Sequence, residues 1–141
     1  MSMEKEFEIV EHTSEVGFRA FGETVEQAFE NAGKATFSLM KPLEDFDSEK
    51  ELEFSIEAES LEALLYDWIE HLIYLRDSEQ LLFKEFTVEI EEDKGGYRLE
   101  AEVRGEDLKG MSAQDVKAVT YSDMEVKQTE DGYMLRVLLD V

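Results

Sequence analysis

One short segment, residues 51–59, alternates strictly between polar and apolar side chains, and it constrains the fold more than any other feature. Leu52, Phe54, Ile56 and Ala58 occupy every second position, and the positions between them hold glutamates and one serine. Because successive side chains of an extended chain point to opposite faces, this pattern predicts a half-buried β-strand. The strand needs a core on one side and presents a strongly acidic face on the other.

Two other stretches carry apolar residues at helical spacing. The first begins at Thr24, where Gln27 three positions later completes a capping-box pattern, and it ends before Pro42, the only proline. The second begins at Ser60, a favourable N-cap residue, and carries a stripe of leucines together with Trp68. We therefore predict two amphipathic helices, each preceded by a strand.

Further runs with a period of two predict additional strands. These runs cover residues 7–10, 16–21, 86–90, 97–103 and 133–139, and another begins at Met124. Residues 105–114 show no periodicity and predict a loop. We expect an α+β fold in one domain over residues 1–141. Its architecture would be a compact two-layer sandwich of about six to seven strands and two main helices, built from strand–helix–strand units.

The charge of the chain restricts its partners. Its 36 acidic and 14 basic residues give a formal net charge of −22. Nine Phe, five Tyr and one Trp distinguish the chain from disordered acidic sequences and can form a packed core. Nucleic-acid backbones and anionic membranes repel an acidic surface. We therefore expect no direct binding to nucleic acid or membrane, and partners that are cations or basic patches on another macromolecule.

The residue types that are missing exclude several kinds of site. The chain has no cysteine and only two histidines, which excludes disulfide scaffolds, thiol nucleophiles and a multi-histidine metal site within one chain. The N-terminal residues lack the basic start and apolar run of a signal peptide. No stretch approaches the ~18 apolar residues that a membrane span requires. These features predict a soluble, cytoplasmic protein.

The last predicted strand carries a carboxylate out of phase with its main apolar stripe. Asp140 shares a side with Arg136 and Leu138, where a buried carboxylate would need a partner or a ligand. Calcium and magnesium take oxygen ligands from carboxylates, main-chain carbonyls and water. Glu15, Asp140 and Val141 could supply such oxygens if the strand after Glu15 meets the last strand.

Three further side chains are candidates for chemistry, and each also has a simpler structural interpretation. His12 lies in a polar turn and could carry a proton, although a hydrogen-bonded turn histidine is the simpler interpretation. His71 lies within the second helix, where we expect a structural or surface histidine. Lys117 follows the predicted loop and forms either an ion pair or a fixed cation directed at a phosphate or carboxylate.

At several of these residues the sequence resembles the archease family. The resembling segments occur in family order along essentially the whole chain. They are residues 12–17, 19–20, 22, 24, 27–30, 61–68, 72–75, 105–106, 116–121 and 140–141. The Lys-Ala-Val-Thr-Tyr run that begins at Lys117 is quite specific, whereas the leucine-rich helix alone is not.

The resemblance implies a function that composition does not reveal. Archeases are not ligases themselves; they assist the GTP-dependent RtcB-type RNA ligase that joins tRNA exon halves during splicing. They promote formation of the ligase–guanylate intermediate and support multiple turnover. The resemblance therefore implies a protein activator rather than an enzyme, with the RtcB-type RNA ligase as its partner. The family fold is a small α/β sandwich built from strand–helix–strand units.

The resemblance also implies site residues. A divalent cation, calcium first with magnesium and manganese as alternatives, would be held by Glu15, Asp140 and the backbone of Val141. Lys117 matches the functional lysine of the family, and His12 belongs to the same functional set. The family usually has aspartate where this chain has Glu15, which adds a methylene to the ligand. A chaperone-like or binding module for another protein client remains the alternative, and a stand-alone metal-dependent hydrolase is a third hypothesis.

Overall fold

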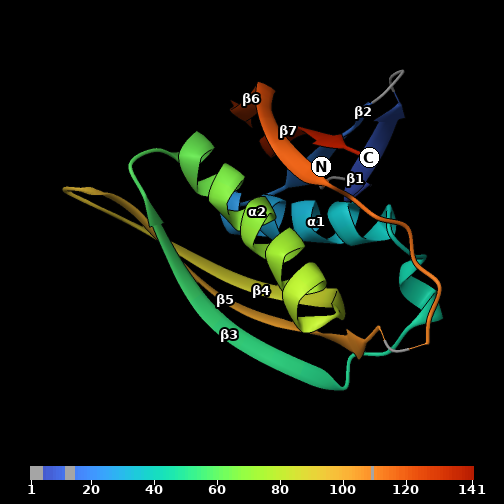
Figure 1. Cartoon of the computed structure of the whole chain (residues 1–141). Helices are drawn as coiled ribbons and strands as arrows, with labels where there is room; N and C mark the ends of the chain where they lie inside the picture. The colour runs from blue at the N-terminus through green and yellow to red at the C-terminus, as the bar shows by residue number, and fades with distance from the viewer. Residues whose placement is uncertain (1–4, 12–14, 109) are drawn as a thin grey trace.

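The fold consists of two antiparallel sheets on opposite sides of a pair of helices (Figure 1). The computed structural model describes residues 5–11, 15–108 and 110–141. The strands are β1 (Phe7–Glu11), β2 (Glu15–Gly22), β3 (Lys50–Ala58), β4 (Leu81–Asp93), β5 (Gly96–Asp107), β6 (Ala118–Thr129) and β7 (Gly132–Asp140). The helices are α1 (Val25–Ser38), the short 3-10 helix η1 (Leu43–Asp45) and α2 (Leu61–Glu79). One sheet has the order β1-β2-β7-β6, and the other has the order β3-β5-β4.

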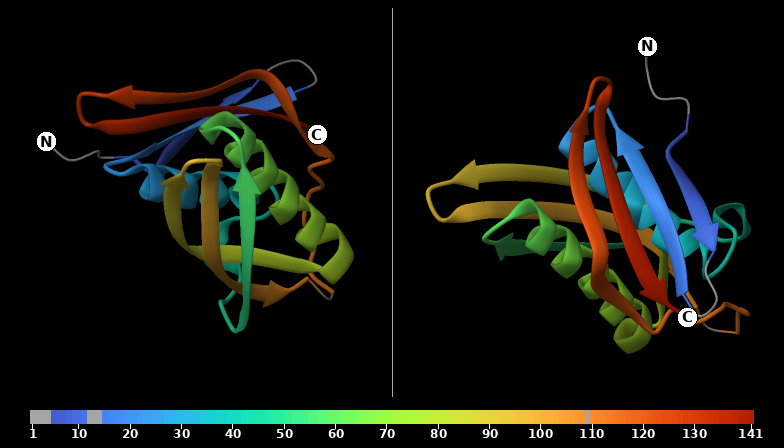
Figure 2. Two further views of the ribbon diagram at one scale, coloured as in Figure 1. Left: turned by 90° about the vertical axis from the view of Figure 1, so that its left-hand side faces the viewer. Right: turned by 90° about the horizontal axis from the view of Figure 1, so that it is seen from above.

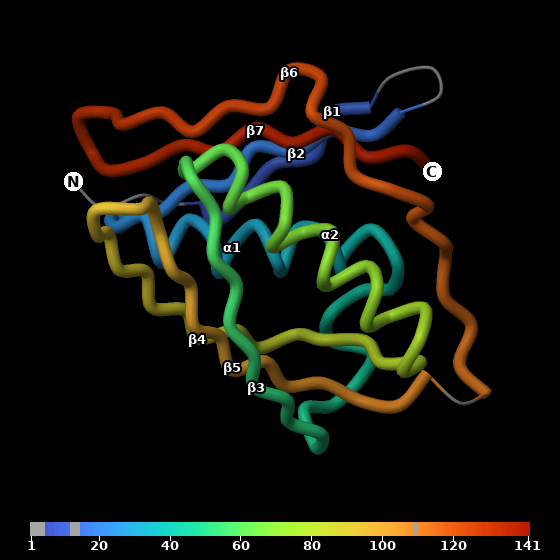
Figure 3. Tube along the Cα trace, turned by 60° about the vertical axis from the view of Figure 1, so that its left-hand side comes forward, coloured from blue at the N-terminus to red at the C-terminus, as the bar shows by residue number. Residues whose placement is uncertain are grey.

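The predicted α+β class is confirmed: the described residues form seven strands in two antiparallel sheets and two main helices. The layering differs from the expected two layers, because α1 and α2 lie between the sheets (Figure 3). Helix α1 packs against β2 and β7 on one side and against β4 on the other. Strands β3 and β4 and the helix α2 between them form a strand–helix–strand unit within one sheet, whereas the chain through α1 passes from one sheet to the other.

Both main helices begin where the sequence predicts. The Thr24 hydroxyl accepts a hydrogen bond from the Gln27 amide at 3.1 Å, and the Gln27 side chain accepts one from the Glu23 amide at 2.7 Å. The Ser60 hydroxyl accepts a hydrogen bond from the Ala63 amide at 3.1 Å. The bonds to the Thr24 and Ser60 hydroxyls satisfy amides that the first helical turn leaves without partners. The helix starts are therefore determined by local sequence.

The centre of the core is the indole of Trp68, which is fully buried between the two sheets. Its Nε1 donates a hydrogen bond to the carbonyl of Phe29 at 2.9 Å, which joins α2 to α1. The rings of Phe54 and Phe86 lie 5.8 Å and 6.1 Å from the indole and come from β3 and β4. The same side chain thus contacts both helices and the three-stranded sheet.

Two boundaries differ from the sequence prediction. Strand β5 continues to Asp107, so the irregular segment begins later than residue 105. Gly105 pairs with Lys50 of β3 and Phe83 of β4, and β4 passes so close that a Cβ at this position would overlap the carbonyl oxygen of Leu82. Strand β6 begins at Ala118, before the predicted start at Met124. Its pairing with β7 is irregular between Thr120 and Glu125, which breaks the period of two.

Neither main helix combines the length and apolar character that crossing a membrane would require, as far as the described residues extend.

Figure 2 views the four-stranded sheet from above and shows β7 running between β2 and β6. Since β7 is the last strand in chain order, this sheet joins segments from both ends of the described chain. That arrangement positions the candidate site.

Candidate functional site

Strand pairing brings three of the predicted site residues together at one end of the four-stranded sheet. The β2–β7 register places Glu15 opposite Asp140. The β6–β7 register places Ala118 opposite Asp140 from the other side. The amide of Lys117 donates a hydrogen bond to the Asp140 carbonyl at 2.8 Å. Val141 follows directly, so the candidate residues that the structure describes lie within one small region.

The exposure of these residues corrects one argument from the sequence. Asp140, Lys117 and Val141 are exposed, and Glu15 is half-buried. The expectation that Asp140 sits in apolar surroundings and requires a ligand for desolvation is wrong. Strand β7 ends at the rim of the sheet, so its last carboxylate reaches solvent although Leu138 on the same side is buried. His12 lies outside the described residues, and its role stays a prediction.

The segment that leads to Lys117 is held in place by contacts with distant parts of the chain. The Leu108 amide donates to the Gln80 carbonyl at 2.7 Å, and the Gln114 amide donates to the Met40 carbonyl at 2.8 Å. Val116, immediately before Lys117, is buried. Main-chain hydrogen bonds and one apolar anchor therefore fix both ends of this irregular segment.

Sequence reasoning missed Arg76 as part of this support. The helix dipole favours a basic residue near a helix C-terminus, so the sequence alone accounts for Arg76 without a partner. Its side chain is buried, and a guanidinium nitrogen lies 3.0 Å from the Asp115 carboxylate, two residues before Lys117. Its position one helical turn after Leu72, on the apolar face, was the available indication. A buried arginine needs a carboxylate partner, and Asp115 supplies it.

The described carboxylates also form two groups of three with oxygens within 4.8 Å of one another. The groups are Asp47, Glu49 and Glu106, and Glu51, Glu53 and Glu102. Exposed acidic clusters of this kind can bind a divalent cation.

Within the described residues, no third carboxylate forms such a group with Glu15 and Asp140. A cation at this end of the sheet would therefore take two carboxylates, a main-chain oxygen of Val141 and water. This donor set consists entirely of oxygen and fits a hard cation such as calcium or magnesium.

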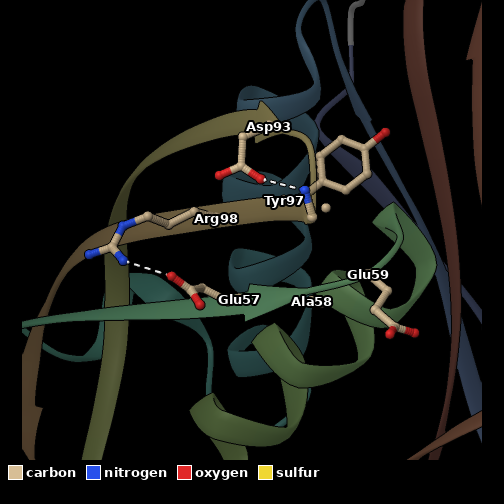
Figure 4. Close-up of a pocket in the computed structure, with 8 residues that line it drawn as sticks. Glu57, Ala58, Glu59, Asp93, Tyr97 and Arg98 are labelled. Carbon is tan, nitrogen blue, oxygen red and sulfur yellow. Dashed lines mark hydrogen bonds and ion pairs between the residues drawn. The ribbon is translucent and has the colours of Figure 1, made fainter.

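A hollow of about 290 Å³ lies in the other sheet, beside the β4–β5 turn (Figure 4). Arg98 reaches across it to the Glu57 carboxylate at 2.9 Å. The Asp93 carboxylate accepts a hydrogen bond from the Gly95 amide at 2.9 Å. Because these polar groups bind one another, the hollow offers few unpaired groups to a ligand.

Comparison with known proteins identifies the family. The model of the Archease protein family matches residues 7–141. The chain belongs to the archease family. It is 35% identical over 144 residues to the protein archease of Methanosarcina barkeri, and the match covers 99% of each chain. The resemblance described from the sequence is therefore confirmed.

Solved structures agree with this assignment. The solution structure of a Methanobacterium thermoautotrophicum protein matches with a TM-score of 0.87 and 35% identity, covering 96% of this chain and 99% of that one. A crystal structure from Thermotoga maritima, described as an archease and possible chaperone, matches with a TM-score of 0.61 over 100% of this chain and 99% of that one. Its identity to this archease is 19%, so it shows a shared fold alone.

The second histidine of this archease packs as a half-buried residue on α2. The ring of His71 lies 4.4 Å from the ring of Phe54 on β3. Burial lowers the pKa of His71 below its ordinary value of 6.5, because the apolar surroundings disfavour the charged imidazolium. The folded state therefore binds this proton less readily than the unfolded state does.

Acidification is expected to destabilise the protein through His71. The stabilising contribution is present above the unfolded pKa of about 6.5 and is lost as pH falls through the lower folded pKa. Urea unfolding at pH 7 and pH 5 should show that the native sequence loses more free energy of unfolding than His71→Gln does. The carboxylates and His12 are common to both proteins, so their contributions cancel. Parallel pH profiles for the two proteins would contradict this assignment.

Proposed function

We propose that the protein activates a GTP-dependent RtcB-type RNA ligase in tRNA splicing, and that it does so without catalysing ligation itself. Membership of the archease family supports this proposal. The observation that carries it is the strand pairing that brings Glu15, Lys117 and Asp140 to one end of a sheet. These residues come from three separate segments. The resemblance associates Lys117 with the functional lysine of the family, and Glu15 and Asp140 with the residues that hold a cation.

The arrangement suggests how activation works. Glu15, Asp140 and a main-chain oxygen of Val141 hold a divalent cation, with calcium first and magnesium or manganese as alternatives. When bound, the cation supplies a positive charge, and phosphate oxygens can coordinate the cation. Lys117 adds a fixed ammonium group whose main chain is tied to Asp140 by the 2.8 Å hydrogen bond. Positioning and electrostatics favour guanylyl transfer, and the covalent chemistry remains with the ligase.

The acidic surface is compatible with a protein intermediary between this archease and RNA. A net charge of −22 disfavours direct contact with an RNA backbone but favours a basic surface on the ligase. Docking of the Glu15–Asp140 end near the guanylylation site of the ligase would place Lys117 close to nucleotide phosphates. We place this activity in the cytoplasm.

The decisive test is RNA ligation by the matching ligase under multiple-turnover conditions, with and without this protein. We expect the ligase alone to slow after about one turnover, and stoichiometric archease to restore steady turnover together with faster transfer of labelled GMP to the ligase. The assay should be repeated with protein that has been treated with a chelator, to which calcium, magnesium or manganese is then added separately. Identical ligation and guanylylation with and without the protein, under all three metals, would contradict the proposal.

The alternative is a chaperone-like module that binds another client. This alternative is supported by the description of the Thermotoga maritima structure as a possible chaperone. Affinity capture from a lysate of the source organism distinguishes the two. Recovery of an RNA ligase, with stimulation in the ligation assay, supports activation, whereas recovery of unrelated proteins without stimulation supports the alternative.

A further inference from the structure

Helix α2 leaves one side uncovered, between the edge strand of each sheet. It packs against β6 of the four-stranded sheet and β3 of the three-stranded sheet, and both are edge strands (Figure 1). The uncovered side carries tyrosines, carboxylates and one histidine. We define the α2 face by its residues: Glu62, Tyr66, Asp67, Glu70, His71 and Tyr74, with Tyr121 from β6.

Two tyrosines of the α2 face form a stacked pair. The rings of Tyr66 and Tyr121 lie 4.4 Å apart and only 5° from parallel. Tyr121 remains 54% exposed, and it comes from the part of β6 where the pairing with β7 is irregular. Stacking fixes these rings before any partner arrives, so little side-chain entropy would be lost when they are covered.

Beside this pair lies a hollow of about 420 Å³ between α2 and β3, lined by Ile56, Asp67, Glu70, His71 and Tyr74. The Tyr74 ring is 58% exposed and lies 5.9 Å from the ring of His71. The hollow thus combines two carboxylates with aromatic walls and an aliphatic side chain.

The carboxylates of the α2 face have no cationic partner among the described residues. Glu62, Asp67 and Glu70 take part in no ion pair there, whereas Arg98 and Arg104 each pair with two glutamates of the three-stranded sheet. The only arginine or lysine of α2 is Arg76, which is buried and paired with Asp115.

The negative field also affects the stacked tyrosines. The pKa of the Tyr66 phenol is raised, first by desolvation and then by the Glu70 carboxylate. The pKa of the Tyr121 phenol is raised, first by desolvation and then by Asp67 and Glu62. Both phenols therefore stay neutral and available for stacking near neutral pH.

We propose that the α2 face binds an arginine-bearing segment of a partner protein. A guanidinium group in the hollow would hydrogen-bond to the carboxylates of Asp67 and Glu70 and stack on the ring of Tyr74. Arginine fits because its planar fork matches carboxylates and stacks on aromatic faces, whereas the lysine ammonium is a compact, strongly hydrated charge. A second copy of this chain does not fit, because it would bring another net charge of −22. The proposal is separate from the Glu15–Asp140 site and from the identity of the ligase.

Titration of the isotopically labelled full-length chain tests the proposal without any ligase. The probes are an octa-arginine peptide, an octa-lysine peptide of equal charge, and spermine. We expect amide shifts concentrated in α2 and the start of β6, and affinity for octa-arginine at least about 5-fold above that for octa-lysine. Equal affinity for the two peptides, or a spermine footprint of the same strength on these residues, would overturn the arginine assignment.

Charge-matched variants separate the α2 face from general attraction to an acidic protein. Asp67→Asn/Glu70→Gln should weaken octa-arginine binding about 10-fold, because it removes two charge-assisted hydrogen bonds. Glu89→Gln/Glu91→Gln removes the same charge from exposed positions on β4 and should change affinity less than about 2-fold. Tyr74→Ala keeps every charge and should still weaken binding about 3-fold. Equal losses in the two double variants would overturn the proposal.

Discussion

Replacing Trp68 with alanine is expected to lower the free energy of unfolding by about 3–5 kcal/mol. The indole is fully buried and contacts both helices and the three-stranded sheet, so its removal leaves a cavity that no single element can close. The change also removes the 2.9 Å hydrogen bond to the Phe29 carbonyl, which links α2 to α1. The substitution should therefore destabilise the central helical layer, and with it the packing of both sheets.

Urea unfolding followed by far-UV circular dichroism measures this effect, because the variant removes the only tryptophan and its fluorescence. Trp68→Phe retains most of the apolar volume and should cost about 1–3 kcal/mol, mainly from the lost indole hydrogen bond and the smaller ring. Tyr74→Ala on the exposed side of the same helix should change stability by no more than about 0.5 kcal/mol. If Trp68→Ala lowered the free energy of unfolding as little as Tyr74→Ala, the placement of Trp68 at the centre of the core would be contradicted.

Changing Asp140 to asparagine is expected to reduce stimulation of ligase guanylylation by about 10-fold or more at limiting metal. Outer-shell changes at metal sites already cost about 10–100-fold in affinity or activity, and Asp140 is proposed as a direct ligand. The amide is nearly isosteric and leaves the Lys117–Asp140 main-chain hydrogen bond in place, so the fold should not change. Initial rates of GMP transfer to the matching ligase measure the effect.

Two comparisons show whether the loss comes from the metal. Glu89→Gln makes the same charge change at an exposed position of the three-stranded sheet and should retain full stimulation. Lys117→Met should also lose stimulation, but only Asp140→Asn should recover when calcium or manganese is raised. Stimulation by Asp140→Asn equal to that by Glu89→Gln would contradict the ligand assignment.

The elements that the sequence predicts well are those whose determinants are local. Thr24 and Ser60 cap helices through hydrogen bonds to amides three residues later, so the capping pattern is contained within each segment. The alternation over residues 51–59 predicts one face turned toward the core, and in β3 the alternate apolar side chains are half-buried against it. Gly105 shows the limit of this reasoning. It resembles a loop residue in the sequence, but it pairs with both neighbouring strands, and the close approach of Leu82 explains why this position is a glycine.

Pairing between distant strands is harder to predict, because the periodicity of one strand does not indicate which other strand lies beside it. From the sequence, Glu15 and Asp140 could bind one cation only if their two strands met. The β2–β7 register shows that these strands are neighbours. The resemblance to archeases singled out Lys117, whereas nothing in the sequence indicated that Tyr66 would stack on Tyr121. Alternation does not reveal where a strand reaches the rim of its sheet, so the sequence alone does not show that Asp140 is exposed.

The central position of β7 has a consequence for how the protein is made. Synthesis proceeds from the amino end, so β2 and β6 leave the ribosome before the strand that joins them. Until β7 emerges, β2 lacks one neighbour, and the apolar side of α1 that packs on β7 stays uncovered. A nascent or truncated chain can contain Glu15 and Lys117 but cannot bring them together. The assembled site therefore marks a chain whose translation has proceeded through its last strand.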